Sequence, residues 1–314
     1  MMNADNQDTI EVAREVDAVI ALRRAWQPMV SDPNADIDFY LTVVQSRTEV
    51  LRPHVIVLKR SGAVRCILVG RIEKKALKVG LGYTKVTLPT ARFLTLIHGG
   101  LLGDDSEENV LALAGSVMKS LREHEADLAW FYGMDSHSAF CRVAKNMGGF
   151  FTRDHFPEWI PHWTVQLPAT YEGLYRRLSA NTRHNLKRYS ERLREAFGGQ
   201  VTIRSFRDPS DIEWILSDTE AIASKTYHRA LGVGFTLNDE TRRLMNLAAT
   251  HGWLRAHILY TAGKPCAFSS ALARNYQGLL TKNDPRRDDE NGCFALRQTP
   301  GRPFCRFPTV NHFR

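Results

Sequence analysis

The chain has 314 residues, of which 43% are hydrophobic and 24% are charged, and its formal net charge at pH 7 is +8. This length predicts about two globular domains, and the composition argues against a disordered protein. The positive charge favours anionic partners without specifying which. No apolar run approaches the roughly 18 residues of a membrane span, and the acidic, polar N-terminus lacks the layout of a secretory signal.

Cysteine usage indicates a reducing compartment. The five cysteines are scattered, odd in number and free of any C-x-x-C spacing. This distribution argues against a disulfide framework and against a zinc site. We therefore expect a cytoplasmic protein that binds no metal.

The first half of the chain predicts alternating strands and helices. Residues 9–16 alternate polar and apolar side chains, as a half-buried strand does. Gly62 is expected in the turn of a hairpin, and Asp105 and Glu108 have the spacing of a capping box. The expected elements are a strand at 9–16, helices at 18–29 and 37–45, the hairpin at 53–73, a strand at 92–102, a helix at 104–121, a strand at 126–134, a helix at 136–147 and a strand at 156–167.

The second half repeats this order. Asp208 caps a helix whose first residue is Pro209, a position at which proline loses no hydrogen bond. Strand, two helices, hairpin and strand therefore occur twice, which predicts two similarly built α/β domains that meet near Leu167. The expected elements are a strand at 201–206, helices at 208–229 and 238–252, a hairpin at 253–275 and a strand at 276–284.

A strongly basic helix lies between the two repeats, at residues 178–197. At about 100° per residue, one arc carries apolar side chains that we expect to face the protein, namely Leu178, Tyr189, Leu193 and Phe197. The far side carries a basic stripe, formed by Arg176, Arg183, Lys187 and Arg194. Ser179 or Asn181 can interrupt the helix and cap its second part. The stripe is either a solvated helix face, a site for CoA phosphates or another acidic ligand, or a nucleic-acid surface. Nucleic acid is the least favoured, because no recognisable module accompanies the charge.

Several segments in order resemble the CelD-type acetyltransferase family over roughly residues 9–285. They include "RPHVIVLKRSGAVRCILVGRIE", "WTVQLPATYEGLYRRLSANTRHNLKR" and "SKTYHRALGVGF". Members of that family are often associated with bacterial cellulose or other exopolysaccharide biosynthesis. The tandem order is also similar to that of the Fem-type peptidyltransferases. The resemblance implies an α/β fold of two GNAT-like (acyl-CoA N-acyltransferase) domains, at residues 1–166 and 167–287.

The resemblance also implies transfer of an acyl group, expected to be acetyl, from acyl-CoA to an amine of a small molecule or a nucleotide-linked sugar. Such a reaction needs a base for the amine, donors for the oxyanion and a proton for the thiolate, but no metal. The polar side chains expected near the thioester give Asp284 or His228 as the base and Tyr227 or Tyr276 as the acid. Candidates for substrate or anion binding are Arg183, Lys187, Lys225 and Lys282.

The sequence "RALGVG", which begins at Arg229, matches the family's pyrophosphate motif R-x-x-G-x-G in form. That motif should follow the fourth strand and open a helix, whereas this copy ends the first helix of the second domain. Gly232 and Gly234 are therefore expected to stop one helix and turn the chain toward the next. The same link lies over the acceptor site in GNAT enzymes, which is why Lys225, Tyr227 and His228 are substrate-side candidates.

The family pattern ends abruptly near Arg286. A GNAT domain still needs a phosphate-cradling helix and a fifth strand beyond its fourth strand, but residues 288–314 show neither helical nor strand periodicity and contain three prolines. We expect a truncation or frameshift, an irregular tail at 288–314, and an incomplete second domain that binds acyl-CoA poorly or not at all.

Two further functions remain open. A Fem-like transferase would use aminoacyl-tRNA, which would make the basic stripe a tRNA contact. A non-catalytic partner of a polysaccharide synthase would keep the fold without its chemistry.

Overall fold

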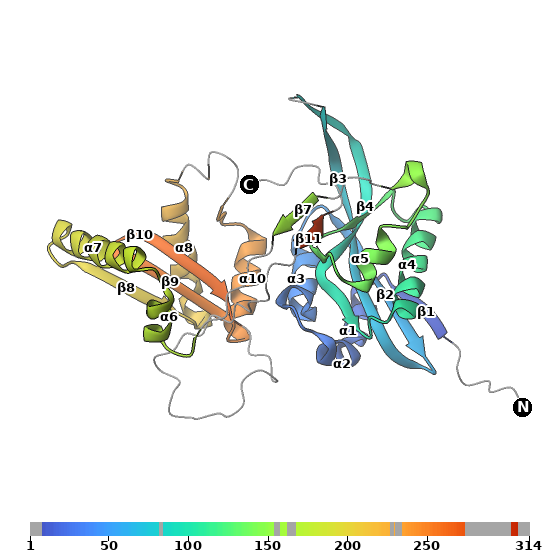
Figure 1. Cartoon of the computed structure of the whole chain (residues 1–314), viewed down its shortest axis with the longest axis horizontal. Helices are drawn as coiled ribbons and strands as arrows, with labels where there is room; N and C mark the ends of the chain where they lie inside the picture. Colours follow the sequence, from blue (N-terminus) through green and yellow to red (C-terminus); the bar gives the residue numbers. More distant parts are fainter. Residues whose placement is uncertain are drawn as a thin grey trace, which may run out of the picture. The chain divides into compact units, whose positions relative to one another are not determined.

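The computed structural model describes residues 8–81, 84–153, 158–161, 168–226, 229, 234–273 and 303–306. The chain divides into two compact units (Figure 1). Unit 1 comprises Met1–His162 with Gly301–His312, and unit 2 comprises Trp163–Pro300 with Phe313–Arg314. Each unit is considered by itself. Among the helices of the described ranges, none combines the length and the apolar character required to cross a membrane.

Unit 1 is built on a mixed five-stranded sheet of order β1-β2-β3-β4-β5. Neighbouring strands are antiparallel except β4 and β5, which are parallel. The strands are β1 (Asp8–Ala13), β2 (Val50–Arg60), β3 (Ala63–Leu81), β4 (Thr84–Gly103) and β5 (Leu128–Phe131). The helices are α1 (Val16–Ala21), α2 (Arg23–Trp26), α3 (Ile37–Ser46), α4 (Glu107–Arg122) and α5 (Ala139–Ala144), with short 3-10 turns at Gln27–Met29, Pro33–Ala35 and Phe150–Thr152.

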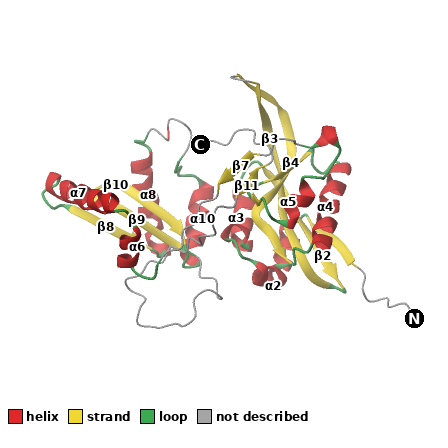
Figure 2. Cartoon of the chain, in the orientation of Figure 1, coloured by secondary structure: helices red, strands yellow, loops and turns green. Residues whose placement is uncertain are grey.

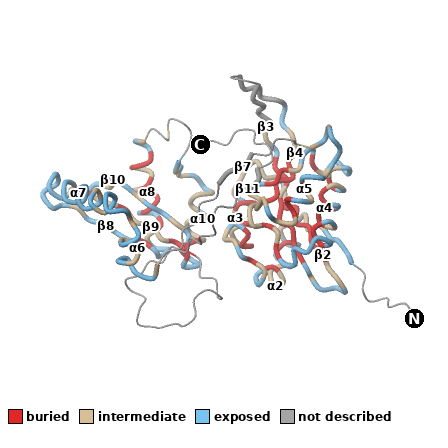
Figure 3. The backbone as a smooth tube through the Cα atoms, in the orientation of Figure 1, coloured by how far each residue is buried: buried red, intermediate tan, exposed pale blue. Residues whose placement is uncertain are grey.

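Helices cover both faces of this sheet (Figure 2). Successive strand residues point to opposite faces, so Ile56 and Leu58 pack with α4 and α5, while Val55 and Val57 pack with α1, α2 and α3. The buried residues of both cores lie in the centre of unit 1, where the tube of Figure 3 is red. The all-apolar run of β2 is therefore that of a strand buried on both faces.

Several predictions for unit 1 hold and others do not. The hairpin at 53–73 is confirmed, with Ser61 and Gly62 at φ 51° and 77° in its turn. Its second strand runs on to Leu81 and the next begins at Thr84, so the two strands are much longer than expected. The predicted capping box is wrong, because the N-cap is Ser106 and its amide donates to the Asp104 carboxylate at 3.0 Å.

Unit 2 has a three-stranded antiparallel sheet of order β10-β9-β8. Its core lies between one face of that sheet and two helices. The elements are α6 (Tyr171–Arg177), α7 (Ala180–Ala196), β8 (Val201–Phe206), a 3-10 turn (Pro209–Asp211), α8 (Ile212–Ala223), α10 (Asp239–Thr250), β9 (Leu254–Thr261) and β10 (Lys264–Leu272). The predicted order of strand, two helices and hairpin is confirmed, although α8 ends at Ala223 and not at Arg229. The strand predicted at 276–284 lies outside the described residues.

The basic helix is interrupted as the sequence suggested, and Ser179 caps α7 by accepting a hydrogen bond from the Thr182 amide at 3.1 Å. The prediction that its apolar arc faces the protein holds only in part, because Leu178 and Leu193 are half-buried while Tyr189 and Phe197 are exposed. No residue of α7 is buried, and Tyr189 and Phe197 are 56% and 40% exposed.

Within residues 288–314 the structure describes β11 (Pro303–Arg306), which pairs with β6 (Met134–Asp135) and β7 (Glu158–Pro161) of unit 1. The prediction of an irregular tail does not hold for these four residues. For the rest of the tail it stays a prediction, as do the domain boundaries and the tandem GNAT arrangement.

Candidate functional site

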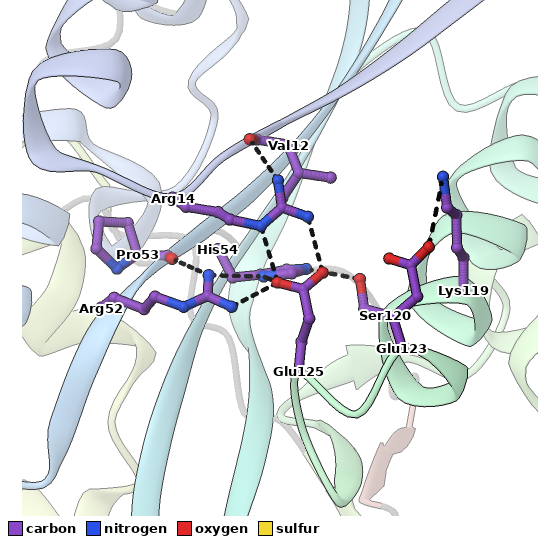
Figure 4. A network of polar contacts seen from close by, with 9 residues as sticks. All are labelled: Val12, Arg14, Arg52, Pro53, His54, Lys119, Ser120, Glu123 and Glu125. Atoms are coloured by element: carbon purple, nitrogen blue, oxygen red, sulfur yellow. Dashed lines mark hydrogen bonds and ion pairs between the residues drawn. The ribbon is translucent and has the colours of Figure 1, made fainter.

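In unit 1 a histidine lies between a serine and a glutamate, the spatial arrangement of a nucleophilic catalytic triad (Figure 4). His54 Nε2 lies 3.0 Å from Ser120 Oγ, and its Nδ1 lies 3.8 Å from Glu125 Oε2. A triad of this kind requires that substrate reach the hydroxyl. His54 is fully buried and Ser120 is 2% exposed, so these groups cannot attack a substrate in this arrangement.

Two arginines, Arg14 and Arg52, donate hydrogen bonds to the carboxylate of Glu125 in this cluster. Glu125 accepts two hydrogen bonds from Arg14, at 2.8 and 2.7 Å, and one from Arg52 at 2.5 Å. The hydrogen bonds from Arg14, the largest cause, and the hydrogen bond from Arg52 hold the pKa of Glu125 at about 2. They outweigh burial, which alone would raise this pKa. Burial lowers the pKa of His54 against the opposing effect of Glu125, so the imidazole is neutral. The cluster joins the residue after β1 (Arg14), strand β2 (Arg52 and His54), helix α4 (Ser120) and the segment after α4 (Glu125), and its role is structural.

A second buried carboxylate, Glu73, lies on β3 with 1% exposure. Its oxygens lie 2.5 Å from Arg71 Nε and 2.5 Å from Lys75 Nζ, and Thr95 donates at 2.7 Å. Burial alone would raise the pKa of Glu73, but Arg71 and Lys75 outweigh burial and hold it at about 2. A carboxylate with these partners is ionised and unavailable as a proton acceptor.

His98 lies on β4 just beyond Leu96, the last residue of β4 that pairs with β5, and contacts Gly133 and Asp32. Its Nδ1 lies 2.5 Å from the carbonyl oxygen of Gly133, and its Nε2 lies 3.2 Å from Asp32 Oδ2. Both partners only accept hydrogen bonds, so both ring nitrogens donate and the imidazole is protonated. The bond to Asp32 is the main reason that the pKa of His98 is raised. A Cβ on Gly99, at φ +69°, would lie 2.4 Å from Asp32 Cβ, so the arrangement requires glycine there.

The N-terminus of α4, which directly follows β4, is unsuited to a phosphate. A helix N-terminus attracts anions through its free amides and its dipole. Here this end carries its own carboxylates, with Glu107 and Glu108 in the first turn and Asp104 and Asp105 directly before the N-cap Ser106. Asp104 already accepts from the Ser106 amide, and four negative charges repel a pyrophosphate. Any CoA site of the usual GNAT kind is therefore disfavoured in unit 1.

Unit 2 places reachable polar groups on both faces of its sheet. On the face that packs against α8, the Tyr260 hydroxyl donates to Asp218 Oδ2 at 2.5 Å, and burial together with this carboxylate raises the pKa of Tyr260 to about 12. The Arg204 guanidinium lies 5.7 Å from the ring centre of Trp214, an exposed side chain on α8. On the opposite face, Ser205 Oγ and His257 Nδ1 are 2.8 Å apart.

Sequence reasoning missed these pairs. The alternation within 201–206 and 254–261 indicates which side of each strand a residue occupies, but not which residue lies opposite it. The register that pairs Ser205 with His257 is a property of the folded sheet.

Of the predicted binding residues, three are described. Arg183 donates to the backbone carbonyls of Leu178, at 2.5 Å, and Arg176, at 3.2 Å, and so caps the end of α6. Lys187 Nζ lies 3.9 Å from Glu191, and Lys225 is exposed just beyond α8. The predicted residues Tyr227, His228, Tyr276, Lys282 and Asp284 lie outside the described residues.

Arg229, which begins the "RALGVG" stretch, is paired with the Glu220 carboxylate of α8. The same carboxylate accepts the Leu237 amide at 3.2 Å. Glu220 therefore holds both ends of the link between α8 and α10. Across the described parts of the chain, no group of three or more His, Cys, Asp or Glu side chains is placed to hold a metal ion.

Comparison with known proteins gives a match to one family model, and the matched residues lie within unit 2. Residues 180–279 match the family model described as an acetyltransferase (GNAT) domain. A comparison with curated proteins gave no match. One similar solved structure, a conserved protein of unknown function from Bacteroides thetaiotaomicron, has 12% identity and a TM-score of 0.45 over 83% of this chain and 75% of its own, a likeness that carries no argument. The chain is thus a mixed α/β protein in which residues 180–279 match the model of a GNAT-type acetyltransferase domain.

Proposed function

We propose that the chain is an acyl-CoA-dependent N-acyltransferase that transfers an acetyl group to an amine, with its reaction site in unit 2. The observation that carries the proposal is the family match over residues 180–279, which coincides with the α7-to-β10 part of unit 2. The acidic N-terminus of α4 supports the same assignment, because it disfavours CoA binding in unit 1.

The chemistry requires an unprotonated amine close to the thioester. A positioned base contributes about 10²–10⁴-fold and one oxyanion donor on the order of 10²–10³-fold. We assign the base to His228 or Asp284 and the acid to Tyr227 or Tyr276, with Lys225 and Lys282 on the substrate side. The acceptor in this proposal is an amine of a small molecule or a nucleotide-linked sugar, as in exopolysaccharide biosynthesis of the CelD-like kind.

Two alternatives are kept because the positive charge of α7 leaves them open. A Fem-like enzyme would use aminoacyl-tRNA and would bind tRNA through that helix. A non-catalytic partner of a polysaccharide synthase would bind neither ligand.

The deciding experiment is the thermal stability of the purified 314-residue chain with acetyl-CoA and, separately, with tRNA. A ligand that binds only the folded state at about 100 times its Kd stabilises it by about 2.7 kcal/mol. We expect acetyl-CoA to raise Tm only at high concentration, because unit 2 of this chain is predicted to bind acyl-CoA poorly, and tRNA to have no effect. A rise with tRNA alone supports the Fem-like alternative, and no rise with either supports the non-catalytic one.

Variants then locate the site. Lys225→Ala should raise the KM for the amine acceptor, and His228→Ala should lower kcat. Lys119→Ala is the matched control, because this lysine is similarly exposed but belongs to α4 of unit 1. The same titration with acetyl-CoA tests the expectation that unit 2 of this chain binds acyl-CoA poorly.

A further inference from the structure

The helix α7 and the strand β8 that follows it expose a group of large apolar side chains. Leu186 and Tyr189 are 46% and 56% exposed, Phe197 is 40% exposed, and Ile203 is 66% exposed. Figure 3 draws almost all of α7 in the colour of exposed residues. Exposed apolar side chains that gather on one side of a helix, as Leu186, Tyr189 and Phe197 do, mark a surface that a partner covers.

The charges of α7 are ordered around the helix with respect to this apolar side. At about 100° per residue, Leu186, Tyr189 and Phe197 share one side with the half-buried Leu193. Cations border that side on both flanks, with Lys187 and Arg194 on one and Arg192 on the other. Arg188 lies farther round the helix, but its guanidinium reaches back to the ring of Tyr189. The two glutamates, Glu191 and Glu195, lie opposite the apolar side.

The cations dominate the segment. Residues 180–206 contain six arginines and lysines and two glutamates, so the net charge is 6 − 2 = +4. Arg188 lies over the ring of Tyr189, 5.0 Å from its centre, and donates to its hydroxyl at 3.2 Å. A cation that lies along an exposed aromatic ring can keep its charge in a polar layer while the ring enters an apolar one.

We propose that α7 and β8 form a docking surface for a bilayer rich in anionic lipids. Interfacial helices combine a strongly polar composition with a narrow apolar side bordered by lysine and arginine. In α7 the cations beside the apolar side lie where lipid phosphates would be, and the glutamates lie on the opposite side, from which Glu191 reaches Lys187 at 3.9 Å.

Charge and apolar exposure together favour this partner over two others. A second copy docked through the same side would bring like-charged flanks together. A nucleic acid would neutralise Lys187 and Arg192 but would leave Leu186 and Ile203 in water. The proposal does not depend on acyl transfer, because it concerns residues to which the reaction assigns no chemistry apart from Lys187.

The test is co-sedimentation of the full chain with vesicles of phosphatidylcholine, with and without phosphatidylglycerol. We expect binding only to the vesicles that contain phosphatidylglycerol. Added salt should weaken this binding without abolishing it, because salt screens the charges but not the apolar contact. No binding to anionic vesicles would overturn the proposal.

Two variants and a matched control test separately the apolar contact and the electrostatic attraction to the bilayer. The apolar variant, Leu186→Ser with Ile203→Thr, changes only well-exposed side chains and should abolish sedimentation. The flank variant, Lys187→Gln with Arg188→Gln and Arg194→Gln, should lower partition on the order of 100-fold, from about tenfold or less per cation. The control, Glu191→Gln with Glu195→Gln, changes the opposite side and should bind at least as well as the original chain, because it removes two negative charges and releases Lys187 from Glu191.

Three results would overturn the proposal in favour of another partner. Binding to duplex RNA or DNA that the apolar variant retains would indicate a nucleic-acid surface. A dimer that the apolar variant dissociates would indicate a second copy. Equal loss of vesicle binding in the control and the flank variant would show that the order of charges around α7 is irrelevant.

Discussion

In unit 1 the polar groups that resemble reactive ones are enclosed: Glu73 is 1% exposed, His54 is fully buried, and each has all its partners within the same unit. In unit 2 the corresponding groups lie at the surface. Ser205 and His257 face away from the core, and Trp214 is 61% exposed on α8.

The difference separates two uses of polar side chains. A buried charge is tolerated only when its partners are complete, and a group with complete partners has no capacity left for a ligand. Groups that bind or react must stay reachable, at some cost in stability. This contrast agrees with the position of the family match in unit 2.

The largest expected effect follows from breaking the Glu73 cluster. Glu73→Ala leaves Arg71 and Lys75 without their buried counter-charge, which should reduce the free energy of unfolding by about 3–5 kcal/mol. The measurement is urea denaturation. The control is Glu123→Ala, since its pair with Lys119 is half-exposed and worth about 0.5 kcal/mol or less. A loss below about 1 kcal/mol for Glu73→Ala would show that unit 1 does not depend on this cluster.

The next effect is a loss of stability in acid. The folded-state pKa of His54 is lowered to about 4 from 6.5, so its contribution is complete above pH 6.5 and is lost as the pH falls through 4. The pKa of Glu125 is lowered to about 2 from 4.5, so its contribution is lost below pH 4.5. Together, acidification should destabilise the chain, by about 2–3 kcal/mol over the histidine range.

His54→Gln should flatten the part of the profile between pH 6.5 and 4. The exposed His184 of α7 provides the matched control, because His184→Gln should leave the profile unchanged. A His54→Gln profile identical to that of the original chain would show that this histidine is not buried in its neutral form.

The features that the sequence predicted are local ones. The turn of the β2–β3 hairpin follows from Gly62 and its alternating flanks, and the cap of α7 follows from Ser179 alone. The bridge from His98 to Asp32 joins residues that are far apart in the chain, and no periodicity reports such a contact. The helical pattern of α7 groups its apolar side chains on one side but carries no information on whether anything covers them, which is why Tyr189 was expected to face the protein and is 56% exposed.

The smallest effect concerns the Tyr260–Asp218 hydrogen bond of unit 2. The contrast between the two units predicts that the fold tolerates the loss of this bond. Tyr260→Phe removes a hydrogen bond of 2.5 Å, but Asp218 is only half-buried and can exchange the hydroxyl for water. The free energy of unfolding should therefore fall by about 1 kcal/mol. Asp218→Asn keeps an acceptor and should cost less than Tyr260→Phe in the same urea titration. A loss of about 3 kcal/mol for Tyr260→Phe would place this pair beside Glu73, and the distinction between an enclosed unit 1 and an open unit 2 would fail.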